Sequence, residues 1–356
     1  MSIFEELTRI NGEEIFFLQH RDTGLQAVLA THDSSLGPVV GGIRFQTFED
    51  EKTAARETLR LAEKTTLTAA LFGCDVGGGK IIVGCRSEQA TETMFRALGS
   101  YIQGLNGRFF AFADPGFSSV LLAAVAKETE YVLEMTHPTG GTGLDDAGLA
   151  ARGILLTLKE AVVQRFETSF LEGRTIAVHG VTGLGKPLIQ LFLEEGARVT
   201  ISDPSFERVT QAKRMFPDVA IAMPGDIPFL PVDIFVPCVP GESLSRDAVR
   251  KLNCKILAGV VENPLAQEEM VEFLHEAGTL YIPDFLLQAG SLITVHAALK
   301  GHSDEETART IESIAPRIGS ILKQARAAGI SPMAQARLLA QERIAAVRTL
   351  KKIYRV

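Results

Sequence analysis

The clearest indication of the fold is the segment Val178-His179-Gly180-Val181-Thr182-Gly183-Leu184-Gly185. Its first two residues end an apolar run typical of a buried strand, residues 174–179. Its last two residues open a helix predicted over 184–195. Thr182 stands where the Gly-x-Gly-x-x-Gly dinucleotide-binding pattern has its second glycine. Gly180 can still make the tight turn, and the two later glycines leave room for a pyrophosphate at the helix N-terminus. Strand, glycine loop and helix together predict a dinucleotide-binding site.

An acidic residue ends the next predicted strand. This strand covers residues 198–202 and is followed by Asp203. A carboxylate at this place can accept a hydrogen bond from a ribose 2′-hydroxyl and repels a 2′-phosphate, so we predict NAD rather than NADP. Arg208 lies close enough in the sequence to affect that preference. The alternative to a nucleotide site is a helix-capping loop in an ordinary α/β domain.

The rest of the chain predicts an α/β protein with two domains. Strands at 198–202, 232–236, 256–260 and 279–282 alternate with helical or loop segments, which predicts a parallel sheet with right-handed crossovers. Before them, helices are predicted at 3–10, 49–72 and 90–105, and strands at 14–18, 25–31, 81–84 and 108–113. A Pro/Gly/Thr-rich segment, 136–143, is typical of a linker. We therefore predict a mixed α/β domain at 1–136 and a Rossmann-type doubly wound domain at 137–329.

Composition excludes several classes of partner. The net charge of −7 gives no electrostatic basis for binding nucleic acid or an anionic membrane. The four cysteines lie far apart, without a CxxC pair or the spacing of metal ligands, so we expect reduced thiols and no metal site. The N-terminus lacks the basic and apolar regions of a signal peptide, and no apolar run is long enough to span a membrane. We expect a cytoplasmic protein.

A second glycine-rich motif contains a lysine. Gly77-Gly78-Gly79-Lys80 comes directly before a predicted strand, Ile81–Gly84. Three glycines let a main chain approach a ligand closely, and the pKa of a lysine falls readily on burial. The motif is not a phosphate-binding P-loop, because Cys74 and Ile81 replace that motif's first glycine and its Ser or Thr. Two interpretations remain, a catalytic lysine or a tight turn with its lysine in solvent.

Further motifs follow one another along almost the whole chain. They are Leu36-Gly37-Pro38, Gly41-Gly42-Ile43-Arg44, Gly77–Lys80, Gly104–Arg108, Asp114 with Gly116, Glu128–Val132, Leu171–Gly173, the 178–185 loop, Pro237–Gly241, Ala258-Gly259, Asn263, Pro283–Phe285 and Ala289-Gly290. On these motifs the chain resembles the glutamate/leucine/phenylalanine/valine dehydrogenase family, most closely its leucine and tryptophan dehydrogenase branch. The resemblance implies reversible, NAD-dependent oxidative deamination of an L-amino acid. It also implies a cleft between two domains, a C-terminal helix (about 330–356) that completes the first domain, and a homo-oligomer, dimeric or larger.

The resemblance also assigns roles on the substrate side. Lys80 would be the general acid and base, and Asp114 would position the ammonium group or the attacking water. The residues that would line the substrate site are Val40, Gly41, Gly42, Thr68 and Val295. From the residues alone, Asp114 is equally a turn aspartate before a proline, and Val40 and Val295 are equally core residues.

The nucleotide side follows from the glycine loop and from the resemblance together. The residues predicted to bind NAD are Gly180, Thr182, Gly183, Leu184, Gly185, Asp203, Pro204, Cys238, Val239, Pro240 and Asn263. By resemblance, Val239 would contact the cofactor through its backbone and Asn263 would lie on the nicotinamide ribose side.

The chain departs from the family pattern at the substrate site. Thr68 replaces a second lysine that in the family pairs with the substrate α-carboxylate, and Ala113 replaces an acidic residue. Losing both charges together is consistent with the cost of an unpaired buried charge. Lys64, one helical turn before Thr68, could reach the same space. Other departures are His179, Thr182, Gln288 and the pair Asp145-Asp146, which we interpret as a solvated helix cap.

Three functions therefore stay open at this point. The first is an NAD-dependent oxidoreductase that acts on an amine or amino acid with an altered carboxylate site. The second is a catalytically silent NAD-binding homologue that serves as a subunit or sensor. The third is a carbonyl or imine reductase that needs no ammonia.

Overall fold

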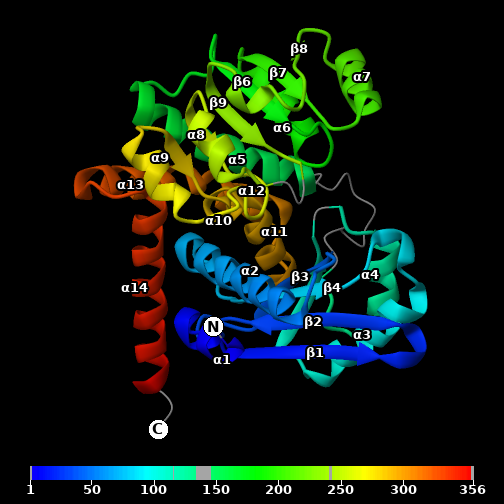
Figure 1. The fold of residues 1–356 in the computed structure, drawn as a ribbon. Coiled ribbons are helices and arrows are strands. Elements are labelled where there is room, and N and C mark those ends of the chain that lie inside the picture. The colour runs from blue at the N-terminus through cyan, green and yellow to red at the C-terminus, as the bar shows by residue number, and fades with distance from the viewer. Residues whose placement is uncertain (1, 115, 134–145, 240–242, 354–356) are drawn as a thin grey trace. The chain divides into compact units, whose positions relative to one another are not determined.

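The computed structural model describes residues 2–114, 116–133, 146–239 and 243–353. Its contacts divide the chain into two units. Unit 1 comprises Met1–Gly143, Val295–His302 and Ala340–Val356, and unit 2 comprises Leu144–Thr294 and Ser303–Leu339. A five-stranded sheet forms the centre of unit 1 and a six-stranded sheet that of unit 2 (Figure 1). The roles predicted for the two domains stay a prediction.

The sheet of unit 1 has the strand order β1-β2-β4-β3-β5. Its strands are β1 (Glu14–His20), β2 (Leu25–Thr31), β3 (Val39–Phe45), β4 (Gly77–Val83) and β5 (Phe109–Ala113). β2 pairs antiparallel with β1 and β4, whereas β3 pairs parallel with β4 and β5. We did not predict β3, because the two glycines at its centre interrupt the pattern of a strand.

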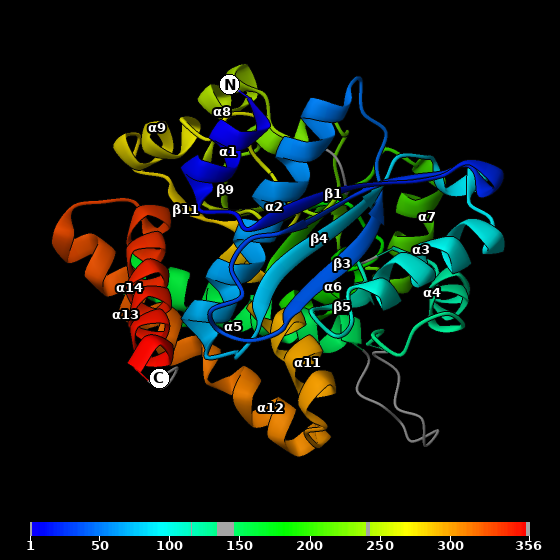
Figure 2. The ribbon, with the colours of Figure 1, turned by 90° about the horizontal axis from the view of Figure 1, so that it is seen from below.

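Helices cover both faces of this sheet (Figure 2). On one face α1 (Ile3–Ile10) and α2 (Glu51–Phe72) pack on β2 through a small cluster of Ile10, Ala30, Leu59 and Ala62. On the other face α3 (Glu92–Gly104) and α4 (Ser119–Ala126) bury a larger cluster that includes Phe95, Leu98 and Val125 with Ile43, Ile81 and Phe109. Alternate residues of each strand therefore face the two layers of helices.

The glycines at 77–79 belong to β4 and are not a turn before it, which corrects the prediction of a strand at 81–84. A Cβ at Gly78 would overlap the Ala62 carbonyl oxygen and the Thr66 amide nitrogen of α2. The Gly78 amide donates to Thr66 Oγ1 at 3.0 Å. At Gly79 a Cβ would lie 2.5 Å from Phe109 Cε2. The run thus lets α2 and Phe109 pack directly on the strand, a role in packing that sequence patterns do not reveal.

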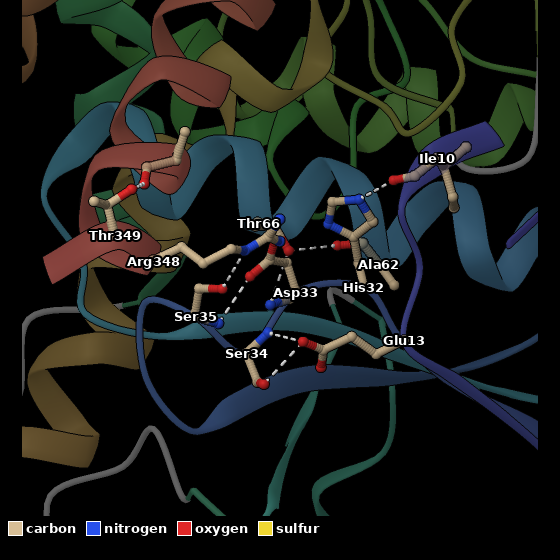
Figure 3. Close-up of polar contacts among 12 residues, drawn as sticks. Ile10, Glu13, His32, Asp33, Ser34, Ser35, Ala62, Thr66, Arg348 and Thr349 are labelled. Atoms are coloured by element: carbon tan, nitrogen blue, oxygen red, sulfur yellow. Dashed lines mark hydrogen bonds and ion pairs between the residues drawn. The ribbon is translucent and has the colours of Figure 1, made fainter. Parts of the chain in front are cut away.

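The last helix, α14 (Pro332–Ile353), contacts unit 1 through two arginines. Arg348 Nη2 lies 2.5 Å from Asp33 Oδ2, and Arg348 Nε donates to Ser35 Oγ at 3.2 Å (Figure 3). Arg343 Nη1 donates to the Ala70 carbonyl at the end of α2, at 3.0 Å. Asp33 is buried and the Arg348 side chain is half-exposed, so this ion pair compensates a carboxylate that would otherwise be costly to bury. The chain from Ala340 onward is therefore tied to unit 1.

Unit 2 has the strand order β11-β10-β9-β6-β7-β8, and every pairing is parallel. Its strands are β6 (Thr175–His179), β7 (Arg198–Ser202), β8 (Ala220–Ile221), β9 (Val232–Pro237), β10 (Cys254–Ala258) and β11 (Leu280–Ile282). The chain runs outward from β6 to one edge and then returns to β9 on the other side of β6. Ligands of such sheets bind at the carboxyl ends of the strands at this switch point. The predicted Rossmann-type sheet is confirmed.

The remaining helices accompany this sheet. They are α5 (Asp146–Phe166), α6 (Gly185–Glu194), α7 (Phe206–Met215), α8 (Arg246–Lys251), α9 (Met270–Glu276), α10 (Asp284–Leu287), α11 (Ala289–Lys300), α12 (Asp304–Glu312) and α13 (Ile314–Ala328). Short 3-10 turns lie at Arg21–Thr23, Ser87–Gln89 and Ile227–Phe229. α11 starts in unit 2 and ends in unit 1. Over the described ranges, none of the helices combines the length and the hydropathy needed to cross a bilayer.

Candidate active site

The structure brings Lys80 and Asp114 together. Lys80 lies in the middle of β4, in register with Ala30 of β2 and Gly42 of β3. Its side chain is on the same face as Gly78, because strand residues alternate, and this is the face that α2 covers. Asp114 follows the carboxyl end of β5, and Lys80 Nζ donates to Asp114 Oδ2 in a buried ion pair. Two residues far apart in the sequence thus form one proton-carrying pair.

Gly42 makes room for this pair. A Cβ at Gly42 would overlap Asp114 Oδ1, so the carboxylate lies directly over the Gly42 α-carbon. Asp114 is held there by its backbone, since its amide donates to the Ile43 carbonyl at 3.3 Å and its carbonyl accepts from the Phe117 amide at 2.9 Å. Gly41 faces the opposite side, where a Cβ would overlap the Phe109 ring. Gly41 can therefore meet a ligand on the Lys80 face only through its backbone.

Thr68 and Lys64 are both buried in α2. Thr68 Oγ1 donates to the Lys64 carbonyl at 3.0 Å, so this hydroxyl satisfies its own helix rather than replacing the missing lysine. Val40 is fully buried, on the same face of the sheet as Gly78. Val295, in α11, is also buried. Burial does not distinguish a substrate pocket from core packing, so the role predicted for these two valines stays a prediction.

The neighbour of Val295 has a defined role in unit 1. The imidazole of His296 accepts a hydrogen bond from the Asp75 amide at Nε2, at 3.3 Å. Burial lowers the pKa of His296, and the neighbouring Lys300 acts in the same direction. A neutral imidazole is the form that accepts such a bond, so the environment of His296 favours the contact that holds this end of α11.

In unit 2 the glycine loop is tightly packed at Gly180 and Gly185 and open at Gly183. Gly180 has a φ of 105°, and a Cβ there would lie 2.7 Å from the Cys238 carbonyl carbon at the end of β9. A Cβ at Gly185, the first residue of α6, would overlap the Gly180 carbonyl oxygen. At Gly183, with a φ of 53°, a Cβ would meet nothing within 4 Å. The loop therefore fits a pyrophosphate at the N-terminus of α6.

Asp203 does not stand free at the end of β7. Its Oδ2 accepts from the Val181 amide of the glycine loop at 3.1 Å, and its Oδ1 accepts from the Ser205 amide at 2.9 Å. Arg208 Nη1 lies 3.7 Å from Oδ1. The sequence placed Asp203 beside the glycine loop, as found, but gave no sign that the carboxylate ties the loop to the start of α7.

The other predicted nucleotide residues are distributed over the same strand ends. The Thr182 carbonyl accepts from the Gly185 amide at 3.0 Å, and Leu184 is the N-cap of α6. Cys238 donates its amide to the His179 carbonyl at 2.6 Å, and burial raises the pKa of its thiol to about 12, so the thiol stays protonated. Pro204 follows Asp203, and Val239 is half-buried after Cys238.

Pro240 and Asp145 lie outside the described residues. Asp146 begins α5, but its side chain is also outside what the structure describes, so the helix cap stays a prediction.

Sequence reasoning missed two residues of this region, Asp284 and Lys186. Asn263 has a positive φ of 53°, and its amide donates to Asp284 Oδ2 at 3.0 Å. The buried Asp284 thereby fixes the backbone of Asn263, a role that the Pro283-Asp284-Phe285 motif could have signalled. Lys186 is exposed in the first turn of α6, next to the place expected for a pyrophosphate.

A surface cavity of about 500 Å³ lies elsewhere in unit 1. Its lining includes Glu13, Thr31, Ser34, Val39 and Arg108, and none of the predicted site residues. Among the described residues there is no cluster of three or more His, Cys, Asp or Glu side chains arranged to hold a metal ion.

A buried lysine–aspartate pair in one unit and a dinucleotide-type sheet with its glycine loop in the other define an oxidoreductase with a nicotinamide-type cofactor site. Comparisons with known proteins narrow this class. Residues 13–120 match the family model "Glu/Leu/Phe/Val dehydrogenase, dimerisation domain", and residues 205–351 match "Glutamate/Leucine/Phenylalanine/Valine dehydrogenase". The chain belongs to this family of amino-acid dehydrogenases, which confirms the resemblance described above.

Individual relatives match over nearly their whole length. Leucine dehydrogenase of Bacillus cereus is 34% identical over 355 residues, 99% of this chain and 96% of the relative. L-tryptophan dehydrogenase of Nostoc punctiforme is 30% identical over 345 residues, 97% of this chain and 96% of the relative. The crystal structure of L-tryptophan dehydrogenase from Nostoc punctiforme superposes with a TM-score of 0.79 at 29% identity, covering 98% of this chain and all of that one.

Proposed function

We propose that the chain is an NAD-dependent dehydrogenase that oxidatively deaminates an amine or amino acid and, in reverse, aminates a carbonyl compound. The observation that carries the proposal is the buried ion pair of Lys80 with Asp114 in a chain of the amino-acid dehydrogenase family. The glycine loop of unit 2, open at Gly183, supports the binding of the dinucleotide. Asp203, directly after β7, stands where this fold holds the adenosine ribose, which supports the binding of a dinucleotide such as NAD.

The residues divide the chemistry between them. When bound, NAD accepts the hydride from the carbon that carries the amine, which leaves a carbon–nitrogen double bond on the substrate. Lys80, as a neutral amine, would take a proton from the water that attacks this carbon. As an ammonium it would then return the proton to the departing nitrogen. Ammonia would leave, and the hydroxyl proton on the same carbon would pass back to Lys80 as the carbonyl forms. Asp114 would hold Nζ in place and balance its charge.

The substrate site is proposed to be altered at the α-carboxylate. Thr68 Oγ1 donates a hydrogen bond to the Lys64 carbonyl and supplies no positive charge. A carboxylate that lost its lysine partner would be bound more weakly by about tenfold or more, since a hydrogen bond to a charged group contributes roughly 1.5–3 kcal/mol. We therefore propose a substrate that lacks this carboxylate or anchors it elsewhere.

A spectrophotometric panel tests both parts of the proposal. NADH formation is followed with L-leucine, L-phenylalanine and L-tryptophan and with the corresponding amines without a carboxylate. NADH consumption is followed with the matching carbonyl compounds, with and without ammonia. We expect ammonia-dependent consumption, and we expect Thr68→Lys to lower the KM for L-amino acids by about tenfold without a similar effect on the amines.

Three other outcomes of the panel would each refute one part of the proposed function. NADH consumption without ammonia would replace amine chemistry by carbonyl reduction. NAD binding without turnover of any compound would indicate the silent homologue. A low KM for L-leucine that Thr68→Lys leaves unchanged would refute only the proposal of an altered carboxylate site.

Assembly and location belong to the same proposal. The family model matched by residues 13–120 is described as a dimerisation domain, which supports a homo-oligomer of at least two copies. Light scattering would check the mass in solution, and a monomer would contradict this part. A small-molecule substrate, no nucleic acid, no membrane and a cytoplasmic location stay predictions from the sequence.

A further inference from the structure

We propose that Arg208 forms a site for a 2′-phosphate, so that this chain binds NADP as well as NAD; the proposal rests on the dinucleotide binding proposed above. The expectation from the sequence was the opposite, because an acid at the end of the second strand of such a sheet repels a 2′-phosphate. The surroundings of Asp203 change that expectation.

The carboxylate of Asp203 is hydrogen-bonded within the protein. Its side chain is 2% exposed, and each oxygen already accepts a backbone N–H, one from Val181 and one from Ser205. Two amide donors stabilise the negative charge and orient the carboxylate toward the glycine loop and the start of α7. Asp203 therefore presents little unscreened charge to a ligand at the end of β7.

Arg208 lies between this carboxylate and solvent. Its Nη1 is 3.7 Å from Asp203 Oδ1, and its side chain is 56% exposed. The pair has no net charge, so the group that reaches further into solvent decides whether a phosphate is attracted or repelled, and that group is the guanidinium. A guanidinium has five N–H donors in a planar fork, and one distant ion pair leaves donors for a phosphate.

The first turn of α7 also holds an acidic side chain. The acidic residue next to Arg208 is Glu207, whose Oε1 accepts from Gln211 Nε2 at 3.3 Å, one turn further along α7. Ser205 accepts the Arg208 amide at its Oγ, at 3.4 Å, which fixes the first turn of α7. Arg208 thus starts from a capped helix end beside the glycine loop, where the adenosine ribose of a dinucleotide binds in this fold.

Calorimetric titration of the full-length protein tests the proposal without any turnover. The probes are NAD, NADP, AMP and adenosine 2′,5′-bisphosphate, the last two differing only by the 2′-phosphate. For the unaltered chain we expect NADP to bind within about tenfold of NAD. In Arg208→Ala we expect the affinities for NADP and the bisphosphate to fall by about ten- to a hundredfold, while those for NAD and AMP change by less than about twofold.

The control is Arg214→Ala, which removes an exposed positive charge from the same helix. It should leave all four affinities nearly unchanged, and Arg208→Lys should retain part of the preference for the 2′-phosphate because its charge is kept. Binding of NADP more than about a hundredfold weaker than NAD, or equal losses for all probes in Arg208→Ala, would overturn the inference and leave the proposed function standing. Failure of NAD itself to bind would instead overturn the proposed function.

Discussion

Replacing Lys80 with alanine is expected to lower kcat for NADH formation by about 10²–10⁴-fold, the usual contribution of a positioned acid–base group. We propose Nζ of Lys80 as the proton carrier, and the substitution removes the ammonium that pairs with Asp114. The affinity for NAD should stay within about twofold, because the glycine loop and Asp203 belong to unit 2. Stopped assays of ammonia release and calorimetry with NAD provide the two measurements.

The matched control for Lys80→Ala is Lys127→Ala, which breaks a lysine–glutamate pair on the surface of the same unit. Lys127 Nζ lies 2.6 Å from Glu92 Oε1, and both side chains are more than half exposed. This substitution should leave kcat unchanged, since exposed pairs contribute little. Because Lys80→Ala removes the cation that pairs with Asp114, Asp114→Asn combined with Lys80→Met supplies a second variant without either charge. A folded, NAD-binding form of either variant with full kcat would refute the role of Lys80.

Gly42→Ala is expected to lower kcat by about 10²-fold or more, because the added methyl would occupy the space of the Asp114 carboxylate. Gly42 lies in β3 and does not have a positive φ, so alanine is allowed by the backbone and the effect comes from the overlap alone. The carboxylate must move off Lys80, and overpacking of this kind costs about 1–3 kcal/mol of stability. Urea unfolding and the kcat assay measure the two effects.

Gly104→Ala provides the comparison, since a Cβ at this last residue of α3 would meet nothing within 4 Å. It should change neither kcat nor the midpoint of unfolding by much. A Gly42→Ala enzyme with normal kcat would mean that Asp114 does not act from its place over Gly42.

Much of the fold was predictable because its local patterns agree with its tertiary structure. The strands at 25–31 and 198–202 were predicted with the bounds that the structure has, since runs of apolar, β-branched residues leave little ambiguity. β3 was missed because a strand containing Gly41 and Gly42 has no local pattern, and it is placed by its pairing with β4 and β5. The glycines of β4 were placed before the strand and not in it, because a run of three glycines also lacks the pattern of a strand.

At the site, the sequence suggested candidate residues, whose roles stay predictions, but not how these residues are held. Lys80 and Asp114 were predicted to act together, and they pair. The overlap that makes Gly42 necessary and the two amides that occupy Asp203 are contacts between segments distant in sequence, which no spacing rule contains. The motif placed Asp203 beside the glycine loop, but the two amides that donate to its carboxylate could not be read from the motif.

The central claim is that this chain moves a hydride from an amine-bearing carbon to NAD and releases ammonia with the help of Lys80. The most direct test uses L-leucine, L-phenylalanine and L-tryptophan, and the corresponding amines, with deuterium on that carbon, and analyses the NADH by mass spectrometry and the solution for ammonia. The account predicts NADH that carries the deuterium in equal amount to the ammonia released, and loss of both with Lys80→Ala. NADH without deuterium, or deuterated NADH without ammonia, would contradict it.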